Sequence, residues 1–263
     1  MKKYVFIFKA TLMESLQYVM NILLGFISFF MLMFVFLCLW QYLYSDSTNL
    51  INGYSMEQMI WYVILTEVLW FGSRSRSLTA QITTDIKSGT IAYGINKPYH
   101  YILFVISKYL GEIVIKLLLF IVVGISIGYF FVGSLEGFQL SKLPFILISG
   151  FFGIMIQAVI RMLISVLSFW IEDSLPFHWI FDKLIIVIGM LFPVEMFPAW
   201  AQPIIRSSPI YVITYAPAKL TIDYSNEVFL STLTAQILYF TITGLFLFLL
   251  FQRGVKKLNV NGG

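Results

Sequence analysis

The chain has 263 residues, of which 59% are hydrophobic and only 11% are charged, and its mean hydropathy is +0.88. This composition excludes an ordinary soluble domain and indicates a protein that crosses a membrane several times. The net charge of +4 therefore bears on orientation in the bilayer, and we do not expect nucleic acid as a partner. The single cysteine, Cys38, excludes a disulfide within this sequence.

Residues 1–20 predict an amphipathic helix at the membrane surface. On a helical wheel, apolar residues share one side and polar residues another: Tyr4, Val5, Phe8, Leu12 and Leu16 against Lys2, Lys3, Lys9 and Gln17. We interpret this segment as an interfacial elbow helix that passes movement into the first span. A helix that only rests among the lipid headgroups is the alternative.

Six apolar runs follow, and each meets or approaches the roughly 20 residues that a helix needs to cross the hydrocarbon core. They extend from Asn21 to Leu43, Met56 to Phe71, Ile113 to Val132, Pro144 to Trp170, Phe177 to Phe192 and Val228 to Phe251. The runs are continuously apolar, whereas strands of a membrane barrel would alternate. We therefore predict an all-α polytopic membrane protein, a single domain over residues 1–263, with six transmembrane helices.

The lysines and arginines favour one orientation of these spans. With both termini inside, twelve of the seventeen fall on the cytoplasmic side: Lys2, Lys3, Lys9, Arg74, Arg76, Lys87, Lys97, Lys108, Lys183, Arg253, Lys256 and Lys257. Three remain outside, at Lys142, Arg206 and Lys219, while Lys116 and Arg161 lie within spans. The positive-inside rule then predicts cytoplasmic termini.

A polar segment at about residues 79–91 separates the second and third spans. Ile82 and Ile86 lie one helical turn apart, and Gly89 is suited to end a helix in the left-handed conformation. The resulting helix of about two turns is too short to be stable alone in water and must pack against another surface. That surface is either a partner or the membrane domain of the chain itself.

Residues 193–217 hold five of the eight prolines, together with Trp200 and Tyr211. Proline at this density prevents one continuous helix, so we expect short broken helices that dip into the outer leaflet. A plain extracellular loop is the alternative.

Charged residues inside spans are costly and need partners. Arg161 is the clearest case, and Glu67 is a conceivable partner for it across the second and fourth spans. Glu112 and Lys116 lie one helical turn apart and can pair with each other. We favour structural pairing over contact with a substrate for all four residues.

The sequence gives little support for catalysis. It contains no GxxxxGK[ST] phosphate-binding loop and no HExxH motif, and we predict neither a metal site nor a catalytic residue. The two histidines, His100 and His178, are expected at membrane edges. Any use of ATP and Mg²⁺ must then take place in a separate protein.

Two stretches resemble a known family. DIKSGTIAYGINKP and GMLFPVEMFPAWAQPIIRSSPIYVITYAPAKL are similar to segments of the permease subunits of bacterial ABC type-2 exporters, in the six-span subgroup with a separately encoded ATPase. The sequence departs from the family pattern in two places. Glu195 is an acid where an apolar residue is expected, and the second span is short and acidic. The resemblance implies a location in the bacterial inner or plasma membrane.

The resemblance also implies two functional regions. The coupling helix, residues 79–91, would dock on the ATPase through Ile82, Asp85, Ile86, Lys87, Gly89, Thr90 and Ile91. An external gate, residues 193–217, would include Pro193, Phe197, Pro198, Trp200, Pro209, Tyr211 and Pro217. We expect exposed Ile82 and Ile86 to anchor the partner, with Asp85 and Lys87 pairing with its charges.

The function implied is outward transport of an amphipathic, peptide, antibiotic or lipid-like substrate. Two ATPase copies and a second permease, identical or related, would complete the assembly, so the chain itself is not expected to be an enzyme. A stand-alone secondary transporter or channel is the main alternative, and it should show inverted repeats and a charged or broken-helix site near the midplane. A membrane-embedded hydrolase is a more distant one.

Overall fold

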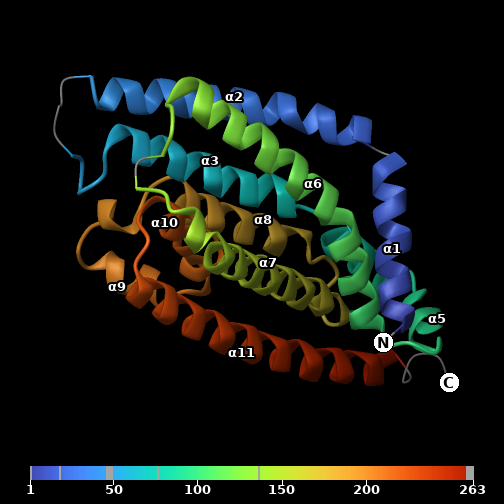
Figure 1. Cartoon of the computed structure of the whole chain (residues 1–263). Coiled ribbons are helices and arrows are strands. Elements are labelled where there is room, and N and C mark those ends of the chain that lie inside the picture. The colour runs from blue at the N-terminus through green and yellow to red at the C-terminus, as the bar shows by residue number, and fades with distance from the viewer. Residues whose placement is uncertain (1, 18, 46–49, 76, 136, 259–263) are drawn as a thin grey trace.

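The computed structural model describes the whole chain except residues 1, 18, 46–49, 76, 136 and 259–263. In the described part every regular element is a helix, and the one β-bridge, between Ile51 and Tyr54, is isolated. The expectation of an all-α polytopic membrane protein is therefore confirmed. The helices run mainly along one direction and form a bundle (Figure 1).

Four helices of the described chain are long and apolar enough to cross a membrane. They are α2 (Val19–Leu43), α6 (Tyr101–Phe131), α7 (Leu143–Val166) with its short flanking turns, and α11 (Asn226–Leu258). Each contains one of the predicted spans. Much of their surface is apolar and exposed, as lipid contact requires.

The two remaining predicted spans are also helical but shorter. Helix α3 (Met56–Ser73) packs against α2, α6 and α10 and is mostly buried, which explains how an acidic segment fits into an apolar bundle. Ser55 caps its first turn and exchanges hydrogen bonds with Gln58. Helix α8 (Leu175–Leu184) continues as a π-helical turn, Ile185–Met190.

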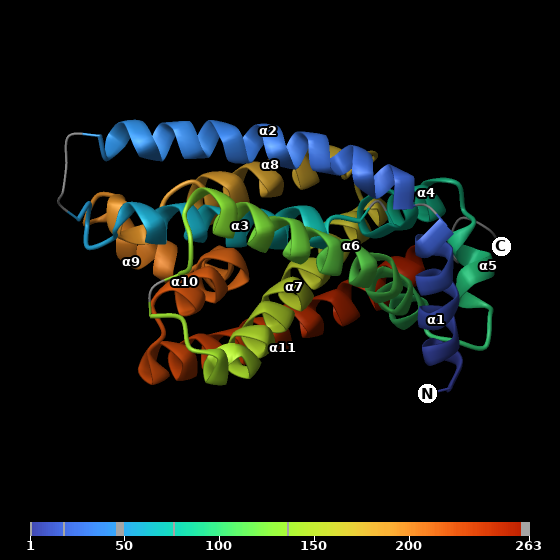
Figure 2. The same ribbon diagram turned by 45° about the horizontal axis from the view of Figure 1, so that its top comes forward.

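The predicted elbow is helix α1 (Lys2–Gln17), which turns away from α2 and lies across α6 (Figure 2). A side chain at Gly111 of α6 would collide with the backbone of α1 at Phe8, so glycine permits this close approach. Thr11 is buried on the contact face, whereas Val5 and Leu16 are about half exposed. Exposed apolar side chains at these two positions are what a helix at the membrane surface presents to lipid. Residues 1 and 18 of the predicted segment lie outside the described residues.

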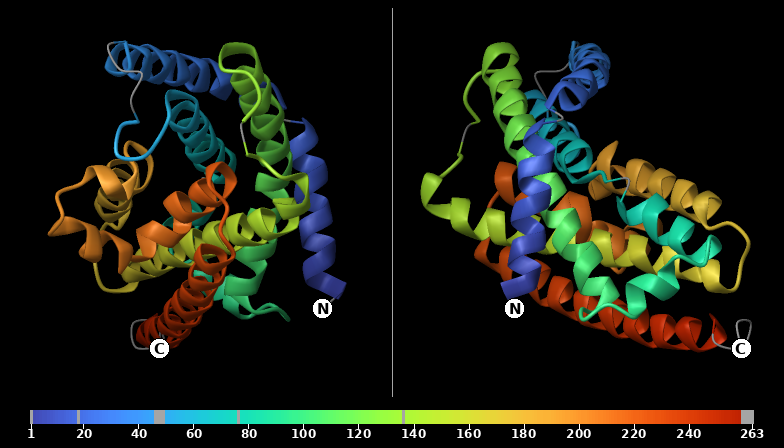
Figure 3. Two further views of the ribbon diagram at one scale, coloured as in Figure 1. Left: turned by 60° about the vertical axis from the view of Figure 1, so that its left-hand side comes forward. Right: turned by 90° about the vertical axis from the view of Figure 1, so that its right-hand side faces the viewer.

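The bundle has two distinct ends. Lys2 and Leu258, the ends of the described chain, lie at the same end as helices α4 (Ile82–Lys87) and α5 (Ile91–Ile95), while α9 (Ala201–Arg206) lies at the other (Figures 1 and 3). The amino-terminal part of α1 meets this first end directly. Lys3 donates a hydrogen bond to the carbonyl of Pro98, and the backbone N–H of His100 donates to the Tyr4 hydroxyl at 2.9 Å.

Residues 193–217 form short helices and turns, as their proline content predicts. The elements are the turn Val194–Met196, α9, the π-helical turn Tyr211–Tyr215 and the start of α10 (Ala216–Ile222). Residues 212–218 are all buried, and the Gln236 side chain of α11 donates to the carbonyl of Val212 at 2.9 Å. This part of the segment is therefore packed inside the bundle and is not a surface loop.

Candidate functional site

The segment at residues 79–91 forms a helical corner at the end that holds the termini. A π-helical turn, Ser77–Gln81, leads into α4, and α5 follows after a tight turn. Gly89 in this turn has φ +74°, so the predicted left-handed end of the helix is confirmed.

The expected exposure of the isoleucines was wrong. Ile82 and Ile91 are fully buried and Ile86 is 7% exposed, in a cluster that includes Val105 of α6 and Val159 of α7. The spacing of the isoleucines does mark an apolar helical face. That face packs against the chain's own membrane helices, because a helix of six residues is stable only when its apolar side is covered.

The charged residues of this corner also have partners within the chain. Asp85 accepts a hydrogen bond from the Tyr101 hydroxyl at 2.5 Å, and Lys87 lies 3.4 Å from Asp173. The backbone N–H of Leu175 and the nearby Lys87 lower the pKa of Asp173. Both residues thus have partners within the chain, and their pairing with charges of an ATPase stays a prediction. The Lys87–Asp173 pair is exposed and contributes little to stability.

The residues that the corner exposes form a surface that we call the end surface, and they include three of the predicted coupling residues, Lys87, Gly89 and Thr90. Tyr93 is the most prominent, with 76% of its surface exposed. The other exposed members are Thr84, Lys87, Ser88, Gly89, Thr90 and Lys97. Tyr93 was not predicted from the sequence, because its exposure is visible only in the structure. A large aromatic residue that is exposed beside polar neighbours indicates a contact surface.

The predicted gate residues do not form a single surface. Trp200 is 75% exposed and Pro198 is exposed, whereas Pro193 and Pro217 are buried. Phe197, Pro209 and Tyr211 are partly buried, and the ring of Tyr211 lies 5.0 Å from that of Tyr215.

Glu195 organises this end of the bundle. Its carboxylate accepts hydrogen bonds from Tyr215 at 2.5 Å, Tyr54 at 3.0 Å, Lys219 at 3.0 Å and Arg206 at 3.1 Å. These residues, the Glu195 cluster, come from the α2–α3 connection and from the segment that follows α8. The acid noted as a departure from the family pattern is thus the residue that links these segments.

Burial alone would raise the pKa of Glu195. The hydrogen bonds from Tyr215 and Lys219 outweigh burial and lower the pKa from 4.5 to about 2. The carboxylate therefore stays charged over the whole physiological range. The same cluster raises the pKa of Lys219 despite the opposing effect of burial.

We expect acid to weaken the Glu195 cluster. Because the pKa of the folded state is below that of the unfolded state, Glu195 stabilises the fold above about pH 4.5 and loses this contribution as pH falls toward 2. Melting temperatures of the purified protein and of a Glu195→Gln variant, measured from pH 7 to pH 3, should differ most at pH 7 and converge in acid. Parallel pH profiles for the two proteins would contradict this role.

The intramembrane charges are paired differently from the prediction. Arg161 of α7 donates to Asp182 of α8 at 2.6 Å, so its expected pairing with Glu67 was wrong. Glu67 is 4% exposed, and its Oε2 atom has no hydrogen-bond partner among the described residues. The predicted pairing of Glu112 and Lys116 is confirmed at 3.0 Å. Asp182 was missed because its contact with α7 depends on how two spans pack.

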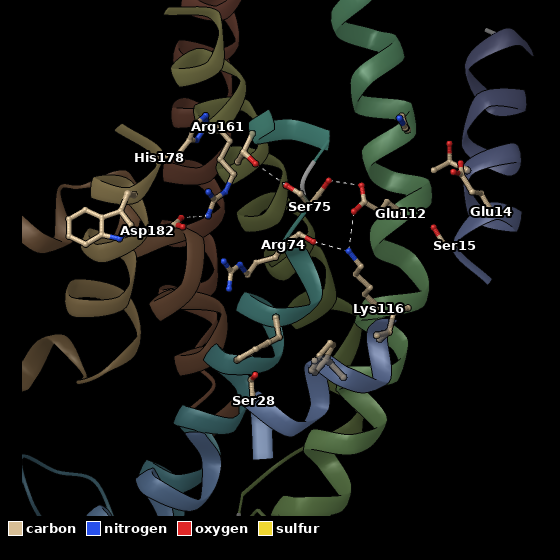
Figure 4. Close-up of a pocket in the computed structure, with 18 of the residues that line it drawn as sticks. Glu14, Ser15, Ser28, Arg74, Ser75, Glu112, Lys116, Arg161, His178 and Asp182 are labelled. Atoms are coloured by element: carbon tan, nitrogen blue, oxygen red, sulfur yellow. Dashed lines mark hydrogen bonds and ion pairs between the residues drawn. The ribbon is translucent and has the colours of Figure 1, made fainter. Parts of the chain in front are cut away.

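Both ion pairs line a cavity of about 980 Å³, which we call the charged cavity (Figure 4). Its walls come from α1, α2, α3, α6, α7 and α8, toward the end that holds α4 and α5. The side chain of Ser75 donates to Glu112 at 2.6 Å, so the polar wall extends beyond the ion pairs. Within the described residues, no group of three or more His, Cys, Asp or Glu side chains is placed to hold a metal ion.

His178 adds a buried polar group to the wall of the charged cavity. It is 4% exposed, and its Nε2 atom lies 2.9 Å from the Ser165 hydroxyl. Because that hydroxyl donates to the carbonyl of Leu78, Nε2 is the donor to Ser165. The Nδ1 atom is then an acceptor, and the described chain gives it no partner.

Comparison with protein families gives one match. Residues 29–262 match the model of a family described as ABC-2 family transporter protein. The match covers nearly the whole chain, including the end surface, the Glu195 cluster and most of the charged cavity. Among curated proteins, none matches the chain significantly.

Proposed function

Because the chain belongs to the ABC-2 family of transporter proteins, we propose that it is the permease subunit of an exporter driven by two copies of a cytoplasmic ABC ATPase. Membership in this family implies a membrane component that works with an ABC ATPase. The sequence has no phosphate-binding loop of its own, so ATP and Mg²⁺ are assigned to the partner. A second permease, identical or related, would complete the pathway.

In this proposal the end surface faces the cytoplasm of a bacterial cell, and the chain resides in the inner or plasma membrane. The described ends of the chain, α4 and α5 lie together at that end. Most of the lysines and arginines outside the spans, including Lys87, Lys97 and Arg253, belong to the same side.

The observation that carries the coupling role is the two-sided packing of the helical corner. Its inner side, with Ile82, Ile86 and Ile91, shares a hydrophobic cluster with α6 and α7, and its outer side exposes Tyr93. A partner that pushes on the end surface would therefore move the membrane helices without an intervening flexible linker. The contacts of Lys3 and Tyr4 extend this connection to α1.

We expect Tyr93→Asp to abolish binding of the ATPase while leaving the permease folded. Exposed aromatic residues are frequent anchors of interfaces, and a charge at this position removes the apolar contact without entering the core. The measurement is co-purification of the ATPase with the tagged permease from its own membranes, together with the melting temperature of the permease.

Trp200→Asp is the matched control, because Trp200 is 75% exposed and directly precedes α9, which lies at the opposite end of the bundle. The Trp200 variant should retain the ATPase. Equal recovery of the ATPase with both variants would place the docking surface elsewhere.

The proposed substrate is amphipathic, peptide, antibiotic or lipid-like, as the resemblance to exporter permeases implies. The rival function, a stand-alone secondary transporter or channel, has one specific observation in its favour. Glu67 is a buried carboxyl group with an oxygen atom that lacks a partner among the described residues, a feature also found in proton-coupled carriers. Transport that continues without any ATPase would favour this rival.

A further inference from the structure

The charged cavity carries more positive charge than its own carboxylates neutralise. Four cationic and three acidic side chains line it: Arg74, Lys108, Lys116 and Arg161 against Glu14, Glu112 and Asp182. Lys116 and Arg161 are paired with carboxylates, and Lys108 donates to the neutral amide of Gln81 at 3.0 Å. Among the residues that the structure describes, Arg74 has no carboxylate within 4.0 Å.

Both arginines of the cavity lie beside the ring of Trp70. Their guanidinium groups lie 5.4 Å (Arg74) and 5.7 Å (Arg161) from the centre of the Trp70 ring. Figure 4 shows the Arg74 side chain extending toward the side of the cavity that holds Arg161 and Asp182. Arg161 has Asp182 as its carboxylate partner and Arg74 has none, so an anion bound at Arg74 would complete the charge balance.

The rim of the cavity is apolar on the side of α8. Leu175 and Trp179 both line the cavity, and 49% and 64% of their surfaces are exposed. The arginines therefore lie next to a surface that lipid chains can contact. Basic pockets between membrane helices, at the depth of the headgroups, are typical sites for anionic lipid headgroups.

We propose that the charged cavity binds the phosphate or carboxylate of an anionic amphiphile, with the anion held by the arginines of the cavity, Arg74 and Arg161, and the apolar part along Leu175 and Trp179. The amphiphile is either a resident membrane lipid or the exported cargo. The binding itself does not depend on the proposed function, whereas its role as cargo rests on it.

The test is binding of fluorescent short-chain phosphatidylglycerol to the purified permease in phosphatidylcholine nanodiscs, with a phosphatidylcholine analogue as the neutral comparison. We expect saturable binding of the anionic probe and about a tenfold loss of affinity in Arg74→Gln, because a charge-assisted hydrogen bond is lost. Arg74→Lys should retain most of the preference. Arg253→Gln is the control, since it removes a cation at the same end but outside the cavity.

Equal affinity for the two probes, or equal losses in Arg74→Gln and Arg253→Gln, would overturn the proposal. Inorganic phosphate that displaces the probe at the same concentration as phosphatidylglycerol would also overturn it, because the apolar part would then contribute nothing. Addition of the ATPase and ATP distinguishes the two sources: a cargo probe moves to the outer leaflet, whereas a resident lipid stays bound. Failure to recruit an ATPase would contradict the proposed function alone, since the binding measurement needs none.

Discussion

Replacing Asp182 with asparagine is expected to lower the free energy of unfolding by about 3 kcal/mol, because it leaves Arg161 as an unpaired charge inside the bundle. The Arg161 side chain is 6% exposed, and its guanidinium lies 5.5 Å from the centre of the Phe181 ring and near that of Trp70. Asp182 is 22% exposed toward the cavity, which places the loss at the lower end of the range for buried pairs.

The measurement is reversible unfolding in detergent with a double-mutant cycle. Asp182→Asn and Arg161→Met should be strongly non-additive, while Arg161→Met and Glu67→Gln should be additive. Lys87→Gln breaks an exposed pair and should cost less than about 1 kcal/mol. If Asp182→Asn and Lys87→Gln lowered the free energy of unfolding by similarly small amounts, the role of the buried Arg161–Asp182 pair would be contradicted.

Replacing Ile86 with aspartate is expected to unfold the helical corner and lower stability by about 4 kcal/mol, because it buries a polar group without a partner. Ile86 is 7% exposed and packs beside the fully buried Ile82. This variant should also fail to bind the ATPase. The cause would be unfolding of the helical corner, because Ile86 itself makes no contact with the partner in this account.

Comparison with Tyr93→Asp separates these two causes. The Ile86→Asp variant should show a lower melting temperature and proteolytic cleavage near residues 82–95, whereas Tyr93→Asp should show neither. Ile86→Val, which keeps an apolar side chain, should retain both the fold and the ATPase. An Ile86→Asp protein that is as stable as the wild type would mean that Ile86 faces a partner after all.

The long elements could be predicted from the sequence because their signals are local. Continuous apolar runs located α2, α6, α7 and α11, and Gly89 marked the end of α4. The proline-rich segment was correctly expected to be broken into short helices. In each case the governing physics, hydrophobic length or backbone freedom, acts over a few neighbouring residues.

The side-chain partners could not be predicted because they depend on contacts between distant parts of the chain. Tyr54 and Glu195 are 141 positions apart, and Arg161 meets Asp182 only because α7 and α8 pack together. The apolar face of α4 was predicted correctly. The spacing of its isoleucines does not show, however, whether another protein or the chain itself covers that face. The charged cavity likewise exists only where six helices meet.

The central claim is that this permease moves its substrate only when an ABC ATPase drives it from the end surface. The most direct measurement is transport of an amphipathic anionic probe in proteoliposomes that contain the permease with or without its ATPase. We predict movement that requires the ATPase and ATP and that is lost in Tyr93→Asp. Transport by the permease alone, driven by an ion gradient and unaffected by ATP, would contradict the claim.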